Sequence, residues 1–373
     1  MKIGIITFWW SDNNYGQILQ CYALQKYLRD KGHEVYLIRY DPRNDYINKN
    51  NIFRILKALN PIKLFNYLKY NIRFIIINFE NKKYNRGFYD FIKNNIVQSS
   101  RIYKSYLELK SNPPEADAYI VGSDQVWNFG ELKINVIKNL IHAYFLDFGP
   151  DNIIRGSYAA SWGKTDINNE LVKEITPLIK KLNYVTVREK SGISICKKCG
   201  KDAQWVPDPT LLLKPDVYRK LYQTVNIKNK KKDYIFIYLL YNKSVFSFKE
   251  LRKWAKERDL DIIYVTGNDK IDFNKKYYAT INEWLALIDN AKYVVTNSYH
   301  CCIFSFIFNK KFLVLPLKNS YKEMNTRLDS LWEIMECKPR LLKNNNFNII
   351  FEEMPVYDYK RIKDKFHIFL DEL

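Results

Sequence analysis

Several features that mark common protein classes are scarce or missing in this sequence. Only 12 glycines occur among 373 residues, and after the first apolar run Gly16 stands alone, so the G-x-G-x-x-G loop of dinucleotide-binding proteins is missing. We therefore expect no nicotinamide or flavin cofactor. No apolar run approaches the ~20 residues that cross a bilayer, and the opening run, residues 1–10, is too short for a signal sequence. These absences favour a cytoplasmic protein, with attachment to the inner membrane face left open.

Cysteine usage excludes a disulfide framework and argues against a metal centre. The six cysteines lack regular spacing in a long chain. Cys196 and Cys199 form a C-x-x-C pair, but no second pair follows at the distance of a zinc ribbon. Cys301 and Cys302 follow His300 directly, yet adjacent residues on a helix rarely chelate one ion together. We expect no metal ion.

The chain is short of acidic residues. It has 60 Lys and Arg against 40 Asp and Glu, a formal net charge of +20. This excess suggests acidic partners such as phosphorylated metabolites, an anionic membrane face, acidic glycans or nucleic acid. A genome rich in A and T is a competing explanation, because Lys, Asn, Ile and Tyr are all frequent. The charge is spread along the chain and no nucleic-acid-binding signature is recognisable, so we expect no nucleic-acid partner.

Length and pattern predict two α/β domains. The first should span residues 1–215 and the second residues 225–350, with a lysine-rich join over 214–232; residues 351–373 should form a C-terminal helix, for which the N-terminal domain is one candidate packing surface. Predicted strands cover residues 3–10, 34–40, 118–122, 154–160, 185–188, 233–240, 261–266, 293–296 and 312–315. Predicted helices cover residues 16–31, 169–182, 246–258 and 356–370, and a capping box at 280–283 opens another.

The stretch from Tyr293 to Leu317 has the clearest functional pattern. A β-branched run ends at Asn297 and Ser298, both good helix N-caps, and apolar residues then recur at helical spacing. His300 should therefore lie at the carboxyl end of a parallel strand, in the first turn of a helix. Open α/β sheets bind ligands at such positions, where free backbone N–H groups attract anions. The alternative is a histidine that only caps or packs.

A second distinctive stretch is the basic amphipathic segment 51–91. It mixes Lys and Arg with Ile, Leu, Phe and Tyr at helical spacing and has almost no acidic residues. Such a segment can lie on an anionic bilayer. The alternative is a pair of helices that cover the sheet and are broken at Pro61.

Ordered motifs over roughly residues 1–335 identify a family resemblance. They are Asn14–Gln17, Gly122–Asn128, Ser157–Ser161, Val187–Ser191, Val206–Thr210 and Asn297–His300. No single motif is specific, but together and in this order they resemble the polysaccharide pyruvyl transferase family. The resemblance implies two Rossmann-like domains facing across a cleft in a GT-B-like fold. It also implies that phosphoenolpyruvate is the donor and that a sugar of a bacterial surface polysaccharide, such as a capsule or exopolysaccharide, is the acceptor.

The same resemblance implies roles for individual residues. Arg188 would hold the donor's anionic groups, and His300 would stand beside the reacting carbon as the proton-transfer group. Family members carry an Arg-Leu pair before this histidine, where this chain has Ser298 and Tyr299. We expect these two residues to contact the donor, and Arg327 to replace the missing cation.

Acceptor contacts are expected on polar residues at the strand ends of the first domain. Short polar side chains suit sugar hydroxyls, and Trp127 would offer a flat face to a pyranose ring; loop capping is the competing role for Ser123 and Gln125. The expected acceptor-binding residues are Asn14, Tyr15, Gly16, Gln17, Ser123, Asp124, Gln125, Trp127 and Ser161. Asp208, between Pro207 and Pro209, is interpreted as a turn former and not as a catalyst.

Three functions follow as hypotheses. The first is a pyruvyl transferase that uses phosphoenolpyruvate as co-substrate, needs no cofactor and forms ketals on a glycan that is lipid-linked at the membrane face. The second is a GT-B-type glycosyltransferase that uses a nucleotide sugar in polysaccharide biosynthesis, suggested by the departure at Ser298 and Tyr299. The third is a non-catalytic binding protein.

Overall fold

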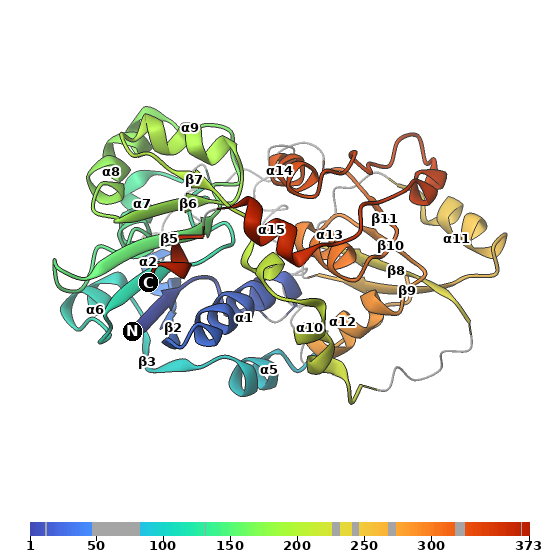
Figure 1. The fold of residues 1–373 in the computed structure, drawn as a ribbon, viewed down its shortest axis with the longest axis horizontal. Helices are drawn as coiled ribbons and strands as arrows, with labels where there is room; N and C mark the ends of the chain where they lie inside the picture. Colours follow the sequence, from blue (N-terminus) through green and yellow to red (C-terminus); the bar gives the residue numbers. More distant parts are fainter. Residues whose placement is uncertain are drawn as a thin grey trace, which may run out of the picture.

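The computed structural model describes residues 1–11, 13–46, 83–130, 132–225, 232–240, 246–267, 274–317, 325–366 and 368–373. Most of the basic amphipathic segment, residues 51–82, lies outside these ranges, so the prediction of membrane contact there stays a prediction. Figure 1 shows two α/β lobes side by side, each with a sheet flanked by helices. No helix within the described ranges is long and apolar enough to cross a membrane.

The N-terminal lobe is built on a seven-stranded parallel sheet with strand order β3-β2-β1-β4-β5-β6-β7. Its central strands are continuous apolar runs because helices cover both faces. The strands are β1 Lys2–Ile6, β2 Glu34–Tyr40, β3 Gln98–Tyr103, β4 Ala118–Val121, β5 Ile154–Ala160, β6 Tyr184–Val187 and β7 Gln204–Trp205. The helices are α1 Tyr15–Asp30, α2 Arg43–Tyr46, α5 Phe88–Asn95, α6 Tyr106–Ser111, α7 Ile134–Tyr144, α8 Asn169–Ile179 and α9 Ser191–Lys198.

The C-terminal lobe has a four-stranded parallel sheet with order β11-β10-β8-β9. Its strands are β8 Tyr234–Leu239, β9 Asp261–Thr266, β10 Tyr293–Thr296 and β11 Phe312–Val314. Its helices are α10 Pro215–Tyr222, α11 Phe248–Lys256, α12 Ile281–Asp289, α13 Tyr299–Ile307 and α14 Thr326–Ile334. The 3-10 helix η1, Pro209–Leu212, lies between the lobes, and η3, Phe347–Phe351, follows α14. The predicted architecture of two Rossmann-like domains in a GT-B-like arrangement is confirmed.

Local signals in the sequence account for several element boundaries. Thr280 and Glu283 form the predicted capping box at the start of α12. Ser298 caps α13 by accepting a hydrogen bond from the backbone N–H of Cys301, as its position predicts. Within the join predicted over residues 214–232, Pro215 opens helix α10, at a position where proline favours a helix start.

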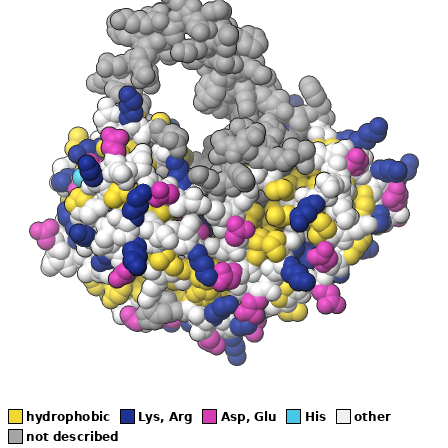
Figure 2. All heavy atoms as spheres, turned by 90° about the horizontal axis from the view of Figure 1, so that it is seen from above, with side chains coloured by type: hydrophobic (Ala, Val, Ile, Leu, Met, Phe, Trp, Pro, Cys, Tyr) yellow, Lys and Arg dark blue, Asp and Glu magenta, His cyan; other side chains and the backbone are white. Residues whose placement is uncertain are grey.

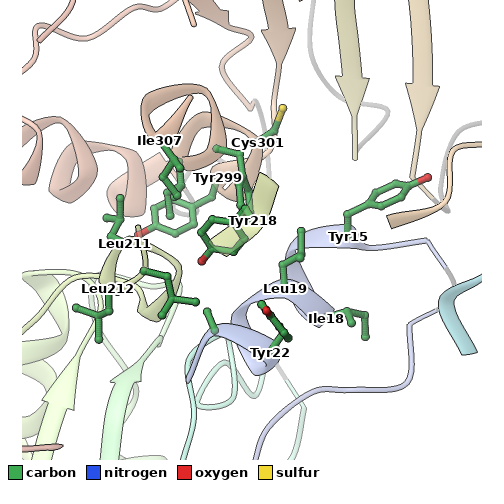
Figure 3. Packing of buried hydrophobic residues seen from close by; sticks show 14 of the residues in the cluster. Tyr15, Ile18, Leu19, Tyr22, Leu211, Leu212, Tyr218, Tyr299, Cys301 and Ile307 are labelled. Atoms are coloured by element: carbon green, nitrogen blue, oxygen red, sulfur yellow. The ribbon is translucent and has the colours of Figure 1, made fainter. Parts of the chain in front are cut away.

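A continuous apolar core joins the two lobes. It contains residues of α1 and η1 together with residues of α12 and α13. Figure 3 shows Leu211, Tyr218 and Tyr299 among the side chains that meet between these elements. Tyr15 crosses from the first lobe: its hydroxyl donates to the carbonyl oxygen of Ala279 at 2.7 Å, and its ring stacks on Trp284. The closed arrangement is therefore stabilised mainly by apolar burial.

The C-terminal segment returns to the N-terminal lobe (Figure 1). Its helix is shorter than the predicted 356–370: α15 spans Tyr359–Lys365, and the 3-10 helix η4, Phe369–Asp371, follows. The backbone is extended at Phe366 and Ile368, which allows Phe369 to stack on Tyr184 with ring centroids 4.7 Å apart. The Tyr27 hydroxyl donates to the Asp371 carboxylate at 2.5 Å.

The first prediction concerns this return. Phe369 is 2% exposed, so Phe369→Ala should lower the free energy of unfolding by about 3–5 kcal/mol through lost burial and a residual cavity. Tyr89→Ala is the matched control, because this aromatic ring is 75% exposed and its removal should change stability by less than about 0.5 kcal/mol. Urea unfolding followed by circular dichroism checks both values. Equal midpoints for the two variants would contradict a stabilising role for the segment.

Candidate active site

The carboxyl ends of the two sheets meet at one buried carboxylate, that of Asp208. Arg188 directly follows β6 of the first lobe, and His300 lies in the first turn of α13, after β10 of the second. The Arg188 Nη1 lies 3.1 Å from Asp208 Oδ2, and the His300 Nε2 lies 3.3 Å from the same oxygen. A guanidinium from the first lobe and an imidazole from the second therefore meet here, with a carboxylate between them.

Both carboxylate oxygens of Asp208 accept hydrogen bonds. Its Oδ2 accepts hydrogen bonds from the Ser123 hydroxyl at 2.9 Å and from Arg188. Its Oδ1 accepts from the backbone N–H and the hydroxyl of Thr210, at 3.0 and 2.7 Å. Asp208 thus caps η1, as a turn former would, and also joins the site. The sequence interpretation found the first role and missed the second.

Electrostatics keep this carboxylate ionised. Burial alone would raise the pKa of Asp208, but His300 and Arg188 lower it, and the pKa lies well below its usual range. Burial would likewise lower the pKa of Arg188, yet Tyr299 and Asp208 raise it. A fully buried charge pair of this kind persists only because each partner compensates the other.

His300 is wedged between the two lobes. It is 6% exposed, with Nε2 facing Asp208. Its other side lies against Gly16 in the first turn of α1: a Cβ at residue 16 would fall 2.3 Å from the ring atoms Cγ and Nδ1. Glycine at position 16 is therefore required for the close approach of α1 to the imidazole. Its predicted contact with the acceptor stays a prediction.

Tyr299 and Arg327 complete the C-terminal side. Two guanidinium groups lie over the Tyr299 ring: that of Arg188 is 4.7 Å and that of Arg327 is 5.6 Å from the ring centroid. Arg327, in the first turn of α14, is brought to the site from the same lobe as His300. Ser298 is the N-cap of α13 and directly precedes Tyr299. The structure thus brings together the four residues expected at the donor, which are Arg188, Ser298, Tyr299 and Arg327.

The residues expected at the acceptor separate into two groups. Asn14 and Gln17 are half-buried at the start of α1, where the Asn14 side chain caps the helix by accepting from the Gln17 N–H. Asp124 and Gln125 follow β4, and the Asp124 carboxylate lies 3.9 Å from Arg188 Nη2. Tyr15, Ser123 and Ser161 are fully buried, and Ser161 donates to the Glu189 carboxylate at 3.1 Å.

Trp127 requires a correction. It is 1% exposed, its ring stacks on Phe145 with centroids 4.8 Å apart, and its Nε1 donates to the Tyr144 carbonyl oxygen. It is a core residue and offers no face to a sugar. Phe145, directly after α7, and Trp162, after β5, pack against its ring, which the local sequence does not reveal.

Several buried polar atoms at this site lack a hydrogen-bond partner among the described residues. They are Arg188 Nε and Nη2, the Tyr299 hydroxyl oxygen and His300 Nε2. Buried polar groups are nearly always paired, so such a cluster is typical of a place where a ligand or water completes the bonding. Guanidinium N–H groups are donors suited to carboxylate and phosphate oxygens.

Metal-binding residues are not grouped here. Within the described ranges, no three His, Cys, Asp or Glu side chains could hold one ion together. The six thiols are free, and burial raises the pKa of Cys301 to about 12, which disfavours the thiolate that would bind a metal.

The comparisons with known proteins identify one family. A family model described as polysaccharide pyruvyl transferase matches residues 14–319. No curated protein matches significantly. Among solved structures, S. aureus MnaA with UDP is 12% identical with a TM-score of 0.48, covering 97% of this chain and 94% of that one. The UDP-GlcNAc 2-epimerase of Methanocaldococcus jannaschii is 14% identical with a TM-score of 0.45, covering 98% of both chains.

The second prediction tests the contact between Gly16 and His300. Alanine favours a helix over glycine by about 1 kcal/mol, so Gly16→Ala would stabilise α1 if nothing opposed the Cβ. We expect instead a loss of about 1–3 kcal/mol from overpacking against the imidazole. His300→Gly removes the ring and also the His300 Cβ, which lies 2.5 Å from the added Cβ, so in this background Gly16→Ala should no longer destabilise the protein. Thermal unfolding measures both; a stabilised single variant would show that the lobes do not hold His300 there.

The third prediction follows from the low pKa of Asp208. A depressed carboxyl pKa contributes stability above the unfolded value of about 3.9, and this contribution is lost as the pH falls through the folded pKa. The difference in unfolding free energy between wild type and Asp208→Asn should therefore be constant above pH ~5 and shrink below pH ~4. Urea unfolding at several pH values measures it. A difference that does not change with pH would show that Asp208 titrates normally.

Proposed function

Because the chain belongs to the polysaccharide pyruvyl transferase family, we propose that it moves pyruvate from phosphoenolpyruvate onto two hydroxyls of a sugar in a bacterial surface polysaccharide. The product is a cyclic ketal. The observation that carries the proposal is the buried group formed by Arg188, Asp208 and His300 at the meeting edges of the two sheets. It combines a proton-transfer group with donors for an anion.

The reaction balances without a cofactor. The methylene carbon of phosphoenolpyruvate gains a proton and becomes a methyl group. One sugar oxygen bonds to the central carbon, the bond from this carbon to the phosphate oxygen breaks, and the second sugar oxygen closes the ketal. The two hydroxyl protons go to the methyl group and to the departing hydrogen phosphate. His300 is the residue suited to carry a proton from hydroxyl to methylene, since imidazole exchanges protons near neutral pH.

The donor's negative charge needs partners beyond Arg188. Asp208 already balances this guanidinium, and Asp124 lies nearby. The remaining attraction would come from Arg327 and from the first-turn backbone N–H groups of α13, which point out of the helix start. Because Arg188 is already balanced by Asp208, Arg327 would replace the cation missing before His300. Tyr299 and Ser298 would shape the same donor site.

The acceptor side would be formed by the start of α1 and the loop after β4. Asn14, Gln17, Asp124 and Gln125 place amide and carboxylate groups there, which suit sugar hydroxyls. We propose that the acceptor is lipid-linked at the inner face of the membrane and that the basic segment 51–91 contacts this face. On the face shown in Figure 2, basic and acidic side chains of the described residues are interspersed.

The fourth prediction tests the reaction. With phosphoenolpyruvate and a panel of galactose-, mannosamine- and glucose-type acceptors, we expect released phosphate together with an acid-labile product, detected by mass spectrometry. His300→Ala should lower turnover by about 100- to 10 000-fold with an unchanged circular dichroism spectrum. His33→Ala is the control, because this histidine lies at the surface beside the N-terminus.

Two outcomes would count against the proposal. No product across the panel from a folded protein would contradict pyruvyl transfer, and full activity of His300→Ala would demote this residue to scaffold. Thermal stabilisation by nucleotide sugars but not by phosphoenolpyruvate would favour the glycosyltransferase alternative. The observation behind that alternative is the departure at Ser298 and Tyr299: Ser298, an uncharged residue, stands where the family resemblance expects an arginine.

A further inference from the structure

Asp208 has more contacts than a turn requires. A carboxylate that only caps η1 would need its bonds to Thr210, and these use Oδ1 alone. Its Oδ2 is nevertheless fully buried and shared by Ser123, Arg188 and His300. A buried charge that only formed a turn would cost stability that an uncharged cap such as Asn would avoid.

The direction of Oδ2 is fixed by this arrangement. Thr210 holds the other oxygen, and the neighbours Pro207 and Pro209 restrict the backbone on both sides. The carboxylate therefore cannot rotate away from the imidazole without breaking several bonds. An acceptor held this way can orient a neighbouring ring.

The two nitrogens of His300 face different surroundings. Nε2 lies 3.3 Å from Asp208 Oδ2, whereas Nδ1 lies on the side of Gly16 and the first turn of α1. The Nε2 contact is within ion-pair distance but is too poorly aligned to count as a hydrogen bond. Hydrogen bonds of catalytic groups are often long or misaligned until substrate is bound. The partner of one ring nitrogen decides which nitrogen carries the proton.

We propose that Asp208 is the positioning residue for His300: it holds the ring through Nε2–H and leaves Nδ1 to exchange protons with the substrates. The kinetic consequences of this role rest on the proposed function. Nδ1 lies beside the start of α1, where the acceptor hydroxyls would approach. Since Asp208 precedes η1 and His300 belongs to the second lobe, the imidazole is oriented only while the lobes are closed.

The chain offers an unusually simple test, because it has only four histidines. In ¹⁵N-histidine-labelled protein, the ring signals of His300 are identified as those lost in His300→Ala. At pH ~8.5, above the usual imidazole pKa of about 6.5, the wild-type spectrum should show the proton of this ring on Nε2. A proton on Nδ1 would overturn the proposal. This measurement requires no substrate and no Asp208 variant.

The second arm is kinetic. Asp208→Asn should lower kcat by about 100-fold or more, with a much smaller change in KM for phosphoenolpyruvate, and should alter the His300 ring signals. The matched control is Asp147→Asn, because Asp147 also pairs with a histidine, His142 of α7, at 2.7 Å, and its other hydrogen-bond partners include Tyr106 and Lys181. It should change the signals of His142 alone and leave kcat unchanged.

The outcomes separate this inference from the proposed function. If the wild-type protein forms no ketal, pyruvyl transfer fails, and the ring spectrum still decides whether Asp208 orients His300. Wild-type kcat in a folded Asp208→Asn variant would overturn the positioning role while leaving pyruvyl transfer intact. If Asp208→Asn does not fold, the wild-type spectrum alone decides.

Discussion

The pairing of one ionised, fully buried carboxylate constrains much of this structure. Transferring such a charge from water costs several kcal/mol unless every lone pair finds a partner. Asp208 meets this demand with groups from distant parts of the chain: a hydroxyl after β4, a guanidinium after β6 and an imidazole from the other lobe. Each must arrive at a strand or helix end within about 3 Å of one oxygen. The mutual placement of the two sheets is therefore tied to one side chain.

Other buried arginines show why Arg188 differs from a structural one. Arg155 donates to carbonyl oxygens in the loop after α7, and Arg340 donates to the carbonyl oxygens of Phe312 in β11 and Ile349 in η3. Neither has a guanidinium nitrogen among the buried atoms that lack a partner. Arg188 instead faces a carboxylate and keeps two nitrogens without a hydrogen-bond partner in the described structure. Loop carbonyls saturate a structural guanidinium, whereas donors left over at a buried site are available to an anion.

Much of the fold was predictable because its signals are local. The strands predicted over residues 34–40, 154–160 and 261–266 match β2, β5 and β9 to the residue, and N-cap residues located the starts of α12 and α13. His300 was found by the change from strand to helix periodicity. Trp127 was misjudged, and the second role of Asp208 was missed, because both depend on contacts far away in sequence. Nothing near Trp127 predicts that Phe145 and Trp162 enclose it. Asp208 does form a turn, and only the tertiary structure adds Arg188 and His300.

The apolar contact between the lobes and the polar contacts around Asp208 respond differently to a small shift of the lobes. Tyr15 stacks on Trp284 across the interface, and the core that contains both continues through α1, η1 and α13. Apolar burial is non-directional, so the lobes can shift slightly against each other without losing most of this stabilisation. The polar contacts around Asp208 are directional and break first under such a shift. Substrate entry would thus exchange the contacts of His300 while the apolar core keeps the lobes together.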